Sequence, residues 1–290
     1  MKKETLQKRI KIANDIMYYV YTHIETHIDI DELSQDFGVS KFHMQRIFKE
    51  AFGRNIYESI KSIRLQKASN LLLTNKYSTI SNIANMCGYS SQSSFIKAFK
   101  ERFRMTPKEW RNGGYRLYSN WILQQSKGAM QSTADFSDVT ATIVKMPIIQ
   151  SYYIRNKGYN TKNIEESWQK LETWVLSNNV KEYQEIALFH DNPTITPLDE
   201  CQYVACIATK NEVDSDRLPK FNISDGVYAK FDLKGKKGDF LRFMNWVYHE
   251  WLLSSEYETT TKPSYAIYHK NKYLSDDKEF DLSFYLPIQF

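Results

Sequence analysis

The sequence predicts two folded parts: an all-α domain with two helix-turn-helix units, followed by an α+β domain of two pseudo-repeated β-α-β-β halves. Short amphipathic helical patterns fill the first third of the 290 residues, and this third repeats itself with an offset of 51 residues. Strand-like and helix-like segments alternate over the remainder. The predicted bounds are 1–113 for the helical domain, 114–135 for a linker and 136–290 for the second domain.

Charge is distributed unevenly between these two parts. Residues 1–113 contain 19 Lys and Arg against 11 Asp and Glu, whereas the remaining residues contain 20 against 23. The helical domain is therefore expected to face a polyanion. Nucleic acid is the leading candidate, although a membrane surface or an acidic protein would attract the same charge.

Neither a membrane anchor nor a disulfide framework is expected. No apolar run approaches the roughly 18 residues of a membrane span, and the N-terminus is amphipathic rather than signal-like. Cys87, Cys201 and Cys206 are odd in number and lack the spacing of metal ligands. We therefore expect a cytoplasmic protein without a metal, a cofactor or a membrane partner.

Helix start signals indicate the first helix-turn-helix unit. Asp29 and Glu32 have the spacing of a capping box, and Gly38 suits a tight turn. Ser40 is a good N-cap for a helix that reaches Phe52. A buried stripe at three- and four-residue spacing predicts a helix before this unit, and it consists of Ala13, Ile16, Met17, Val20 and Ile24.

The helix at 40–52 has two different faces. The inward stripe is expected to contain Met44, Ile47, Phe48 and Ala51. The opposite face carries, at i, i+3, i+4 and i+7, Phe42, Gln45, Arg46 and Lys49. In a DNA major groove Arg bonds guanine, Gln bonds adenine, Lys reaches phosphate and an aromatic ring lies on thymine methyls. An ordinary solvated face would show the same pattern, so this helix by itself leaves both interpretations open.

An internal repeat supplies a second unit of the same kind. The sequence FKEAF at 48–52 recurs as FKERF at 99–103, and Gly38-Val39-Ser40 has a counterpart in Gly88-Tyr89-Ser90. Repetition on this scale is hard to produce by chance. The outward face of the second helix, at 91–103, is less basic and is expected to make weaker contact through Gln92, Ser93, Ile96 and Lys97.

Capping signals also define the helices around the second unit. Asn55 and Glu58 predict a capped helix that holds the two units rigidly apart. Thr106 and Pro107 predict the start of a closing helix, with Trp110 packed back into the second unit.

The second domain is predicted to contain two related halves, each with strands around one helix. The predicted helices lie at 164–176 and 239–253. Trp168 and Trp174 are interpreted as contacts between the first helix and the sheet, and Trp246 as the equivalent contact of the second helix. The predicted strands are 139–144, 148–154, 186–189, 203–208, 227–233, 265–268 and 280–287.

Residues of the helical domain resemble the AraC/XylS transcription regulators over about 100 residues, and their Rob-like branch in particular. Arg104 departs from the glycine that the family usually has before its Thr-Pro pair. The motifs that carry the resemblance are Ser40–Lys49, Ile83-Ala84 before Gly88-Tyr89, and Phe99-Lys100 ahead of Thr106-Pro107 and Trp110-Arg111.

This resemblance implies a regulator, in our interpretation an activator, that binds double-stranded promoter DNA and contacts RNA polymerase. The second helix of each helix-turn-helix unit, at 40–52 and at 91–103, would enter one of two successive major grooves about one helical turn apart. One chain would thereby read an asymmetric site. The implied DNA-binding residues are Lys41, Phe42, Gln45, Arg46, Lys49, Gln92, Ser93, Lys97 and Lys100.

Residues 136–290 resemble the gyrase-inhibitor-like (GyrI-like) effector-binding domain. The resemblance rests on Gly226-Val227-Tyr228-Ala229, Trp251-Leu252, Tyr257-Glu258 and Tyr285-Leu286-Pro287-Ile288. It implies a small aromatic or cationic effector in a cleft between the halves, bound by Tyr228, Trp251, Tyr257, Glu258, Tyr268 and Tyr285. Ala266 stands where the family commonly has a glutamate, which leaves a neutral aromatic ligand open, with Glu258 or Asp281 as alternative acids.

Catalysis is not expected, and no catalytic residue is assigned. His249-Glu250 lacks the second histidine of a zinc-binding HExxH, and neither a phosphate-binding loop nor a GxSxG motif is present. Some stand-alone relatives of the second domain resemble hydrolases that use a tyrosine and a glutamate. The alternatives are therefore a hydrolase of small electrophilic compounds, which Ala266 weighs against, or a module that binds only proteins.

Overall fold

The computed structural model describes residues 3–213, 217–236 and 238–290, with side chains from residue 7 onward. The chain divides into two compact units, Met1–Tyr118 and Ser119–Phe290, which are described separately below. Among the described residues, no helix is both long enough and apolar enough to cross a membrane. The described cysteines, Cys87, Cys201 and Cys206, are buried free thiols.

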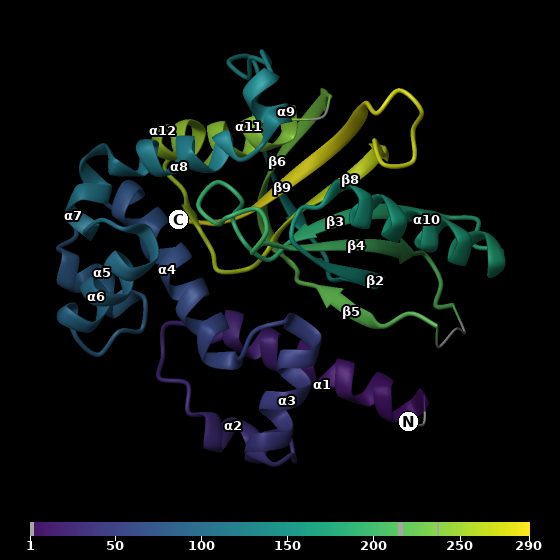
Figure 1. Ribbon diagram of the computed structural model, residues 1–290, viewed down its shortest axis with the longest axis horizontal. Coiled ribbons are helices and arrows are strands. Elements are labelled where there is room, and N and C mark those ends of the chain that lie inside the picture. Colours follow the sequence, from purple (N-terminus) through teal and green to yellow (C-terminus); the bar gives the residue numbers. More distant parts are fainter. Residues whose placement is uncertain (1–2, 214–216, 237) are drawn as a thin grey trace. The chain divides into compact units, whose positions relative to one another are not determined.

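The first unit is entirely helical in its described part (Figure 1). The sequence predicted this all-α architecture, and both helix-turn-helix units are present. Its elements are α1 (Lys3–Thr22), α2 (Ile30–Asp36), α3 (Lys41–Phe52), α4 (Ile56–Thr74), α5 (Ile80–Met86), α6 (Gln92–Phe103), α7 (Pro107–Glu109), the wide turn η1 (Trp110–Gly114) and the start of α8 (Tyr115–Gln124).

Side-chain caps fix where these short helices begin. Asp29 accepts the backbone N–H of Asp31 at the start of α2, and Ser40 accepts that of His43 at the start of α3. A full capping box between Asn55 and Glu58 opens α4. Each cap satisfies amide groups that the first turn of a helix leaves without a partner.

A buried core joins the helices of the first unit. The stripe predicted for α1 is buried, and it packs with Met44, Phe48 and Phe52 of α3. Around the second helix-turn-helix, Trp110 is fully buried against Phe99 and Phe103. Its indole N–H donates to the Ser69 carbonyl at 3.0 Å, which confirms that Trp110 packs back into this unit.

The second unit contains an antiparallel sheet with helices (Figure 1). The neighbouring strands follow the order β1-β6-β9-β8-β3-β4-β2-β5, and β7 pairs with β9. The strands are β1 (Thr142–Met146), β2 (Ile149–Lys157), β3 (Tyr183–Phe189), β4 (Gln202–Thr209), β5 (Lys220–Ile223), β6 (Gly226–Gly235), β7 (Glu258–Thr259), β8 (Ser264–Lys270) and β9 (Phe280–Gln289). The helices are α9 (Lys127–Gln131), α10 (Thr161–Ser177), α11 (Asp239–Trp246), η2 (Val247–Trp251) and α12 (Leu252–Ser254).

Two helices supply most of the core against one face of this sheet. Trp168 and Trp174 of α10 and Phe243 of α11 are buried with alternate residues of the strands, as predicted for the two tryptophans of α10. Trp246 is partly buried against the same core. The coarse α+β architecture is therefore as the sequence predicted, whereas the relation between two pseudo-repeated halves stays a prediction.

Helices occupy part of the segment that was expected to be a weakly patterned linker. Residues 114–135 contain most of α8 and all of α9, where Ser126 caps the backbone N–H of Ala129. The boundary between the two compact units falls inside α8. The domain bounds 1–113, 114–135 and 136–290 remain a prediction.

Candidate DNA interface and candidate ligand cavity

The second helix of the first helix-turn-helix unit, α3, presents an exposed face. Phe42 is 78% exposed, an unusual position for a large aromatic side chain, and Arg46 and Lys49 are exposed beside it. The Arg46 guanidinium lies 3.0 Å from His43 Nδ1. This face combines a bidentate donor, a point charge and an apolar ring, which together match base edges and phosphate in a major groove.

Two of the predicted DNA-binding residues of α3 also have partners within the protein. Lys41 forms an exposed ion pair of 2.9 Å with Asp31 of α2. Gln45 is half-buried, and its Oε1 accepts the backbone N–H of Ile56 at 3.4 Å. Gln45 therefore helps to satisfy the first turn of α4. Its role as a base-reading residue stays a prediction.

The second helix of the second unit, α6, exposes a more polar and less basic face. Gln92, Ser93, Lys97 and Lys100 are exposed, whereas Phe95 and Phe99 are fully buried. Ser91 caps this helix through the backbone N–H of Ser94 at 3.2 Å. The residues predicted to read DNA thus lie on the outward side of α6, as the helical period requires.

Arg64 of α4 connects the two helix-turn-helix units, a role that sequence reasoning did not assign. Its guanidinium donates to the carbonyl of Ile24 at 3.1 Å and to that of Thr26 at 2.7 Å. Its charged group also lies 5.9 Å from the ring centroid of Tyr89, in the turn of the second unit. Burial lowers the pKa of Arg64. Arg64 lies within the helix whose start Asn55 and Glu58 predict, but no motif marks it.

The second unit contains a cavity of about 360 Å³. Six aromatic rings line it, together with four apolar side chains, which is typical of sites for small organic molecules. The lining residues are Ser126, Tyr159, Thr161, Glu165, Phe189, Pro193, Leu198, Tyr203, Gly238, Phe240, Leu241, Met244, Tyr268, Lys272, Tyr273 and Lys278.

The tyrosine hydroxyls in this wall differ in how they are satisfied. The indole N–H of Trp168 donates to the Tyr203 hydroxyl at 3.0 Å, and the hydroxyls of Tyr203 and Tyr268 are hydrogen bonded to each other. The Tyr159 hydroxyl is buried without a hydrogen-bond partner. Burial raises the pKa of all three phenols, so they stay neutral donors at neutral pH.

Charged side chains lie at the part of the cavity formed by the β8–β9 connection. Lys278, whose φ of 56° is unusual for a residue with a side chain, pairs with Glu165 of α10 at 2.8 Å. Lys272 lies over the rings of Tyr273 and Phe280, with its nitrogen 5.2 and 5.3 Å from their centroids.

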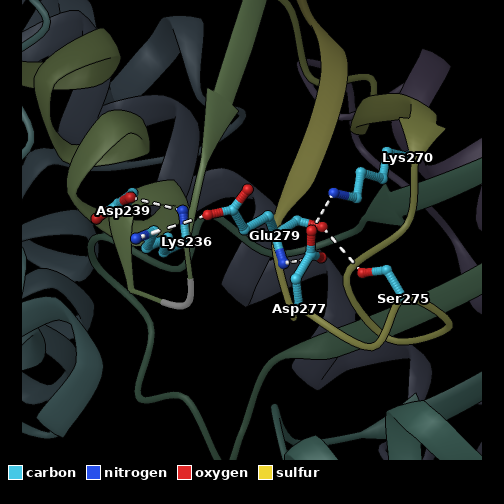
Figure 2. Close-up of polar contacts among 6 residues, drawn as sticks. All are labelled: Lys236, Asp239, Lys270, Ser275, Asp277 and Glu279. Atoms are coloured by element: carbon cyan, nitrogen blue, oxygen red, sulfur yellow. Dashed lines mark hydrogen bonds and ion pairs between the residues drawn. The ribbon is translucent and has the colours of Figure 1, made fainter.

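Further polar contacts fix the two segments that border the cavity (Figure 2). Within the β8–β9 connection, Lys270 pairs with Asp277, which also accepts the backbone N–H of Glu279 at 3.0 Å. Glu279 in turn lies 3.6 Å from the ammonium of Lys236, which precedes α11. The backbone N–H of Lys236 donates to Asp239 at 2.6 Å. Both segments are thereby held beside the cavity by short-range interactions.

Of the residues predicted to bind an effector, Tyr268 lines the cavity. Tyr228 and Tyr285 pack with Tyr265 instead, with ring centroids 5.2 Å and 4.7 Å from that of Tyr265. They alternate along their strands with the residues that face α10 and α11, so they lie on the opposite face of the sheet. Trp251 and Tyr257 stack on each other beside the helix-side core.

The acids considered as replacements for the glutamate missing at Ala266 do not line the cavity. Glu258 lies on the short strand β7, and Asp281 pairs with Lys234 at 2.9 Å. Ala266 itself is fully buried. Glu185, which was not predicted, lies opposite Tyr268 in the β3–β8 register, and burial raises its pKa. Cavity-lining residues such as Tyr159 and Tyr273 carry no motif, so only spatial proximity identifies them.

Two family models match the chain in the same order as the two units. A helix-turn-helix domain matches residues 33–113, and the GyrI-like small molecule binding domain matches residues 140–289, more than half of the chain. The chain therefore belongs to the AraC/XylS family of transcription regulators and carries a GyrI-like domain.

Individual relatives match about a third of the chain. The probable transcription factor PqrA of Proteus vulgaris is 37% identical over 105 residues, which are 36% of this chain and 85% of that protein. The xylose operon regulatory protein of Escherichia coli K12 is 35% identical over 33% of this chain and 24% of its own length. The transcriptional regulator Rob of Salmonella typhimurium is 34% identical over 38% of this chain and 36% of its own length. The match therefore spans about a quarter to a third of these last two relatives.

Proposed function

We propose that the protein binds a specific promoter sequence through α3 and α6 and activates transcription there. The observation that carries this proposal is the pair of capped helix-turn-helix units, each with an exposed, basic or amide-bearing face on its second helix. Phe42, Gln45 and Arg46 would read bases in one groove, and Gln92, Ser93 and Lys97 would do so in the next. Lys41, Lys49 and Lys100 would contact phosphates.

Regulation would come from a small molecule bound in the second unit. The aromatic cavity beside α10 and α11 supports this part, because it is concave and lined by six aromatic rings and four apolar side chains. Tyr268 is the contact proposed from both the sequence and the cavity lining. Contacts through Tyr228, Trp251, Tyr257, Glu258 and Tyr285 stay a prediction. RNA polymerase is proposed as the protein partner, and the cytoplasm as the location.

Selection of bound fragments from sheared genomic DNA, at near-physiological salt, tests the DNA-binding part. We expect one asymmetric motif whose two elements lie about one helical turn apart. Enrichment that is only general and salt-sensitive would contradict sequence-specific binding, because phosphate contacts alone produce that behaviour. A double substitution of Arg46 and Lys97 to alanine serves as the control and should recover no motif.

The direction of regulation needs a separate measurement. A promoter carrying the selected motif is transcribed in vitro with purified RNA polymerase, with and without the protein. More full-length transcript in the presence of the protein is the expected result. A decrease in transcript would replace the proposed activator by a repressor and leave the DNA-binding proposal intact.

A further inference from the structure

The cavity wall contains a donor that the protein does not satisfy. Tyr159, in the short connection from β2 to α10, lines the cavity. Its hydroxyl is buried without a hydrogen-bond partner. An unpaired buried hydroxyl is unfavourable, and a ligand oxygen that accepts its proton would remove this penalty. The other hydroxyls of this wall discussed above, those of Tyr203 and Tyr268, already have partners within the protein.

Two lysines and the N-terminus of α10 favour negative charge near Tyr159, whereas the buried carboxylate of Asp191 opposes it. Residues 159–161 lead into the N-terminus of α10, a helix of 17 residues that has no acidic side chain in its first turn. The exposed amide dipoles at such an end attract anions. Among the described lining residues, Lys272 and Lys278 face a single carboxylate, that of Glu165.

A cationic ligand would meet less favourable conditions. Glu165 is paired with Lys278 at 2.8 Å, so a cation would have to replace that lysine to gain the carboxylate. Ala266, fully buried in strand β8, offers no charge at all. A desolvated cation without a free carboxylate loses hydration that ring faces alone compensate poorly.

We propose that this cavity binds an aromatic carboxylate, whose ring packs against Phe189 and Phe240 and whose oxygen accepts a hydrogen bond from the buried hydroxyl of Tyr159. Lys272 then neutralises the ligand's charge from the β8–β9 connection. This assignment rests on the proposed effector-binding function and adds the chemical class of the effector.

Three probes with the same ring and different charge test the assignment: 2-naphthoate, 2-naphthamide and 2-naphthylmethylammonium. Titration calorimetry on the full chain measures each Kd. We expect naphthoate to bind at least about tenfold more tightly than the ammonium compound, in line with charge-assisted hydrogen bonds. Naphthamide, which offers an acceptor without charge, should lie between them.

Tyr159→Phe separates the hydrogen bond from the packing of the ring. This change should weaken naphthoate binding by about tenfold and naphthamide binding by about two- to tenfold, and leave the ammonium compound unaffected. Tyr265→Phe is the matched control, because the Tyr265 hydroxyl is also buried and unpartnered but Tyr265 does not line the cavity. It should leave all three affinities unchanged. Lys272→Met should weaken naphthoate alone.

The outcomes distinguish this inference from the proposed function. Tightest binding of the ammonium compound, equal losses for all three probes in Tyr159→Phe, or no binding of any probe would overturn the carboxylate assignment. The affinity for the selected promoter motif is measured with each probe in parallel. If the three affinities follow another order but a bound probe changes the affinity for DNA, the proposed effector function stands and the carboxylate assignment is wrong. If naphthoate binds without changing the affinity for DNA, the ligand class stands and its regulatory role is contradicted.

Discussion

The first helix-turn-helix unit makes its turn with residues 37–40, and the second uses residues 87–91, one residue more. Both turns contain a glycine in the left-handed region, with φ of 61° at Gly38 and 72° at Gly88. A Cβ at Gly38 would have no atom within 4 Å, whereas one at Gly88 would lie 2.6 Å from the Ile24 carbonyl oxygen. The glycine of the first helix-turn-helix turn is therefore required only by the local backbone conformation. The glycine of the second turn is also required by the close approach of another segment.

Substitution of these two glycines should have the largest effect. Gly88→Ala is expected to destabilise the protein by about 3 kcal/mol, because backbone strain and overlap with a fixed carbonyl add together. Gly38→Ala adds only the strain and should cost about 1 kcal/mol. Urea unfolding of both variants, followed by helical circular dichroism, measures the difference. Equal losses would mean that the approach of Ile24 to the second turn has no energetic weight.

A second difference lies on the exposed faces of α3 and α6. At the repeat offset of 51 residues, Phe42 corresponds to Ser93, and Arg46 corresponds to Lys97. The first face therefore carries a ring and a planar bidentate donor where the second carries a hydroxyl and a point charge. Only the bidentate donor matches guanine in a single geometry. The first helix-turn-helix unit is therefore expected to supply most of the selectivity for particular bases.

Arg46→Ala should cost about 1–3 kcal/mol of affinity for the selected DNA site and relax the preference at one base pair. Lys49→Ala, at a proposed phosphate contact, should instead weaken all sequences alike and reduce the slope of log K against log salt by about one unit. Fluorescence anisotropy with the site and single-base variants, at several salt concentrations, measures both. Uniform losses in Arg46→Ala would make Arg46 a phosphate contact as well.

The ends of α3 and α6 form a third pair. Gly53 closes α3 with φ of 70°, and Arg104 closes α6 with φ of 59°. A residue with a Cβ is strained in this conformation, so Arg104→Gly should stabilise the protein by up to about 1 kcal/mol. Gly53→Ala should destabilise it by a similar amount. Thermal unfolding of the two variants checks both signs, and a loss of stability in Arg104→Gly would show that the arginine side chain contributes more than the strain costs.

Equivalent ion pairs connect both second helices to the helix that begins each repeat. Glu50 of α3 pairs with Arg9 of α1, and Glu101 of α6 pairs with Lys61 of α4. The hydrogen bond from Lys61 lowers the pKa of Glu101. A carboxyl group whose pKa is lowered in the folded state contributes stability at pH values above its ordinary pKa. This contribution is lost as the pH falls through the lowered pKa.

Replacement of Lys61 by Met should therefore raise the pKa of Glu101 towards its ordinary value. Both side chains are exposed, so the effect on stability should be the smallest of the four and should fall with added salt. Carboxyl titration followed by NMR measures the shift. Glu109, whose pKa is lowered by its capping bonds to Thr106, is the internal control and should not respond.

The helical unit could be predicted closely because its signals are local. Caps such as Asn55 with Glu58 and Thr106 with Glu109 bond within one helical turn, so their spacing alone places the helix start. The exception was the second turn, where the sequence aligned Ser90 with Ser40 but the additional residue makes Ser91 the cap. The helices of 114–135 were not predicted, although Tyr115, Tyr118 and Ile122 of α8 recur at helical spacing and are buried.

In the sheet domain, the sequence indicated strands and helices better than it indicated the face of each side chain. One residue of register decides which face of a strand a side chain lies on. Tyr228 and Tyr285 were predicted to share a ligand site with Tyr268. Their positions in the alternation along β6 and β9 place them on the face of the sheet that lies away from α10 and α11. The cavity draws on segments far apart in the chain, including Tyr159, Tyr203 and Tyr273.

The sequence by itself determined the tandem helices, their outward and inward faces and the change to an α+β part. These features depend on spacing within a few residues, where helical and strand periods act directly. Only the tertiary structure decided that Gly88 lies against Ile24, that Gln45 also caps α4 and that Tyr159 has no partner. Each of these depends on atoms brought together by packing, which no local spacing encodes.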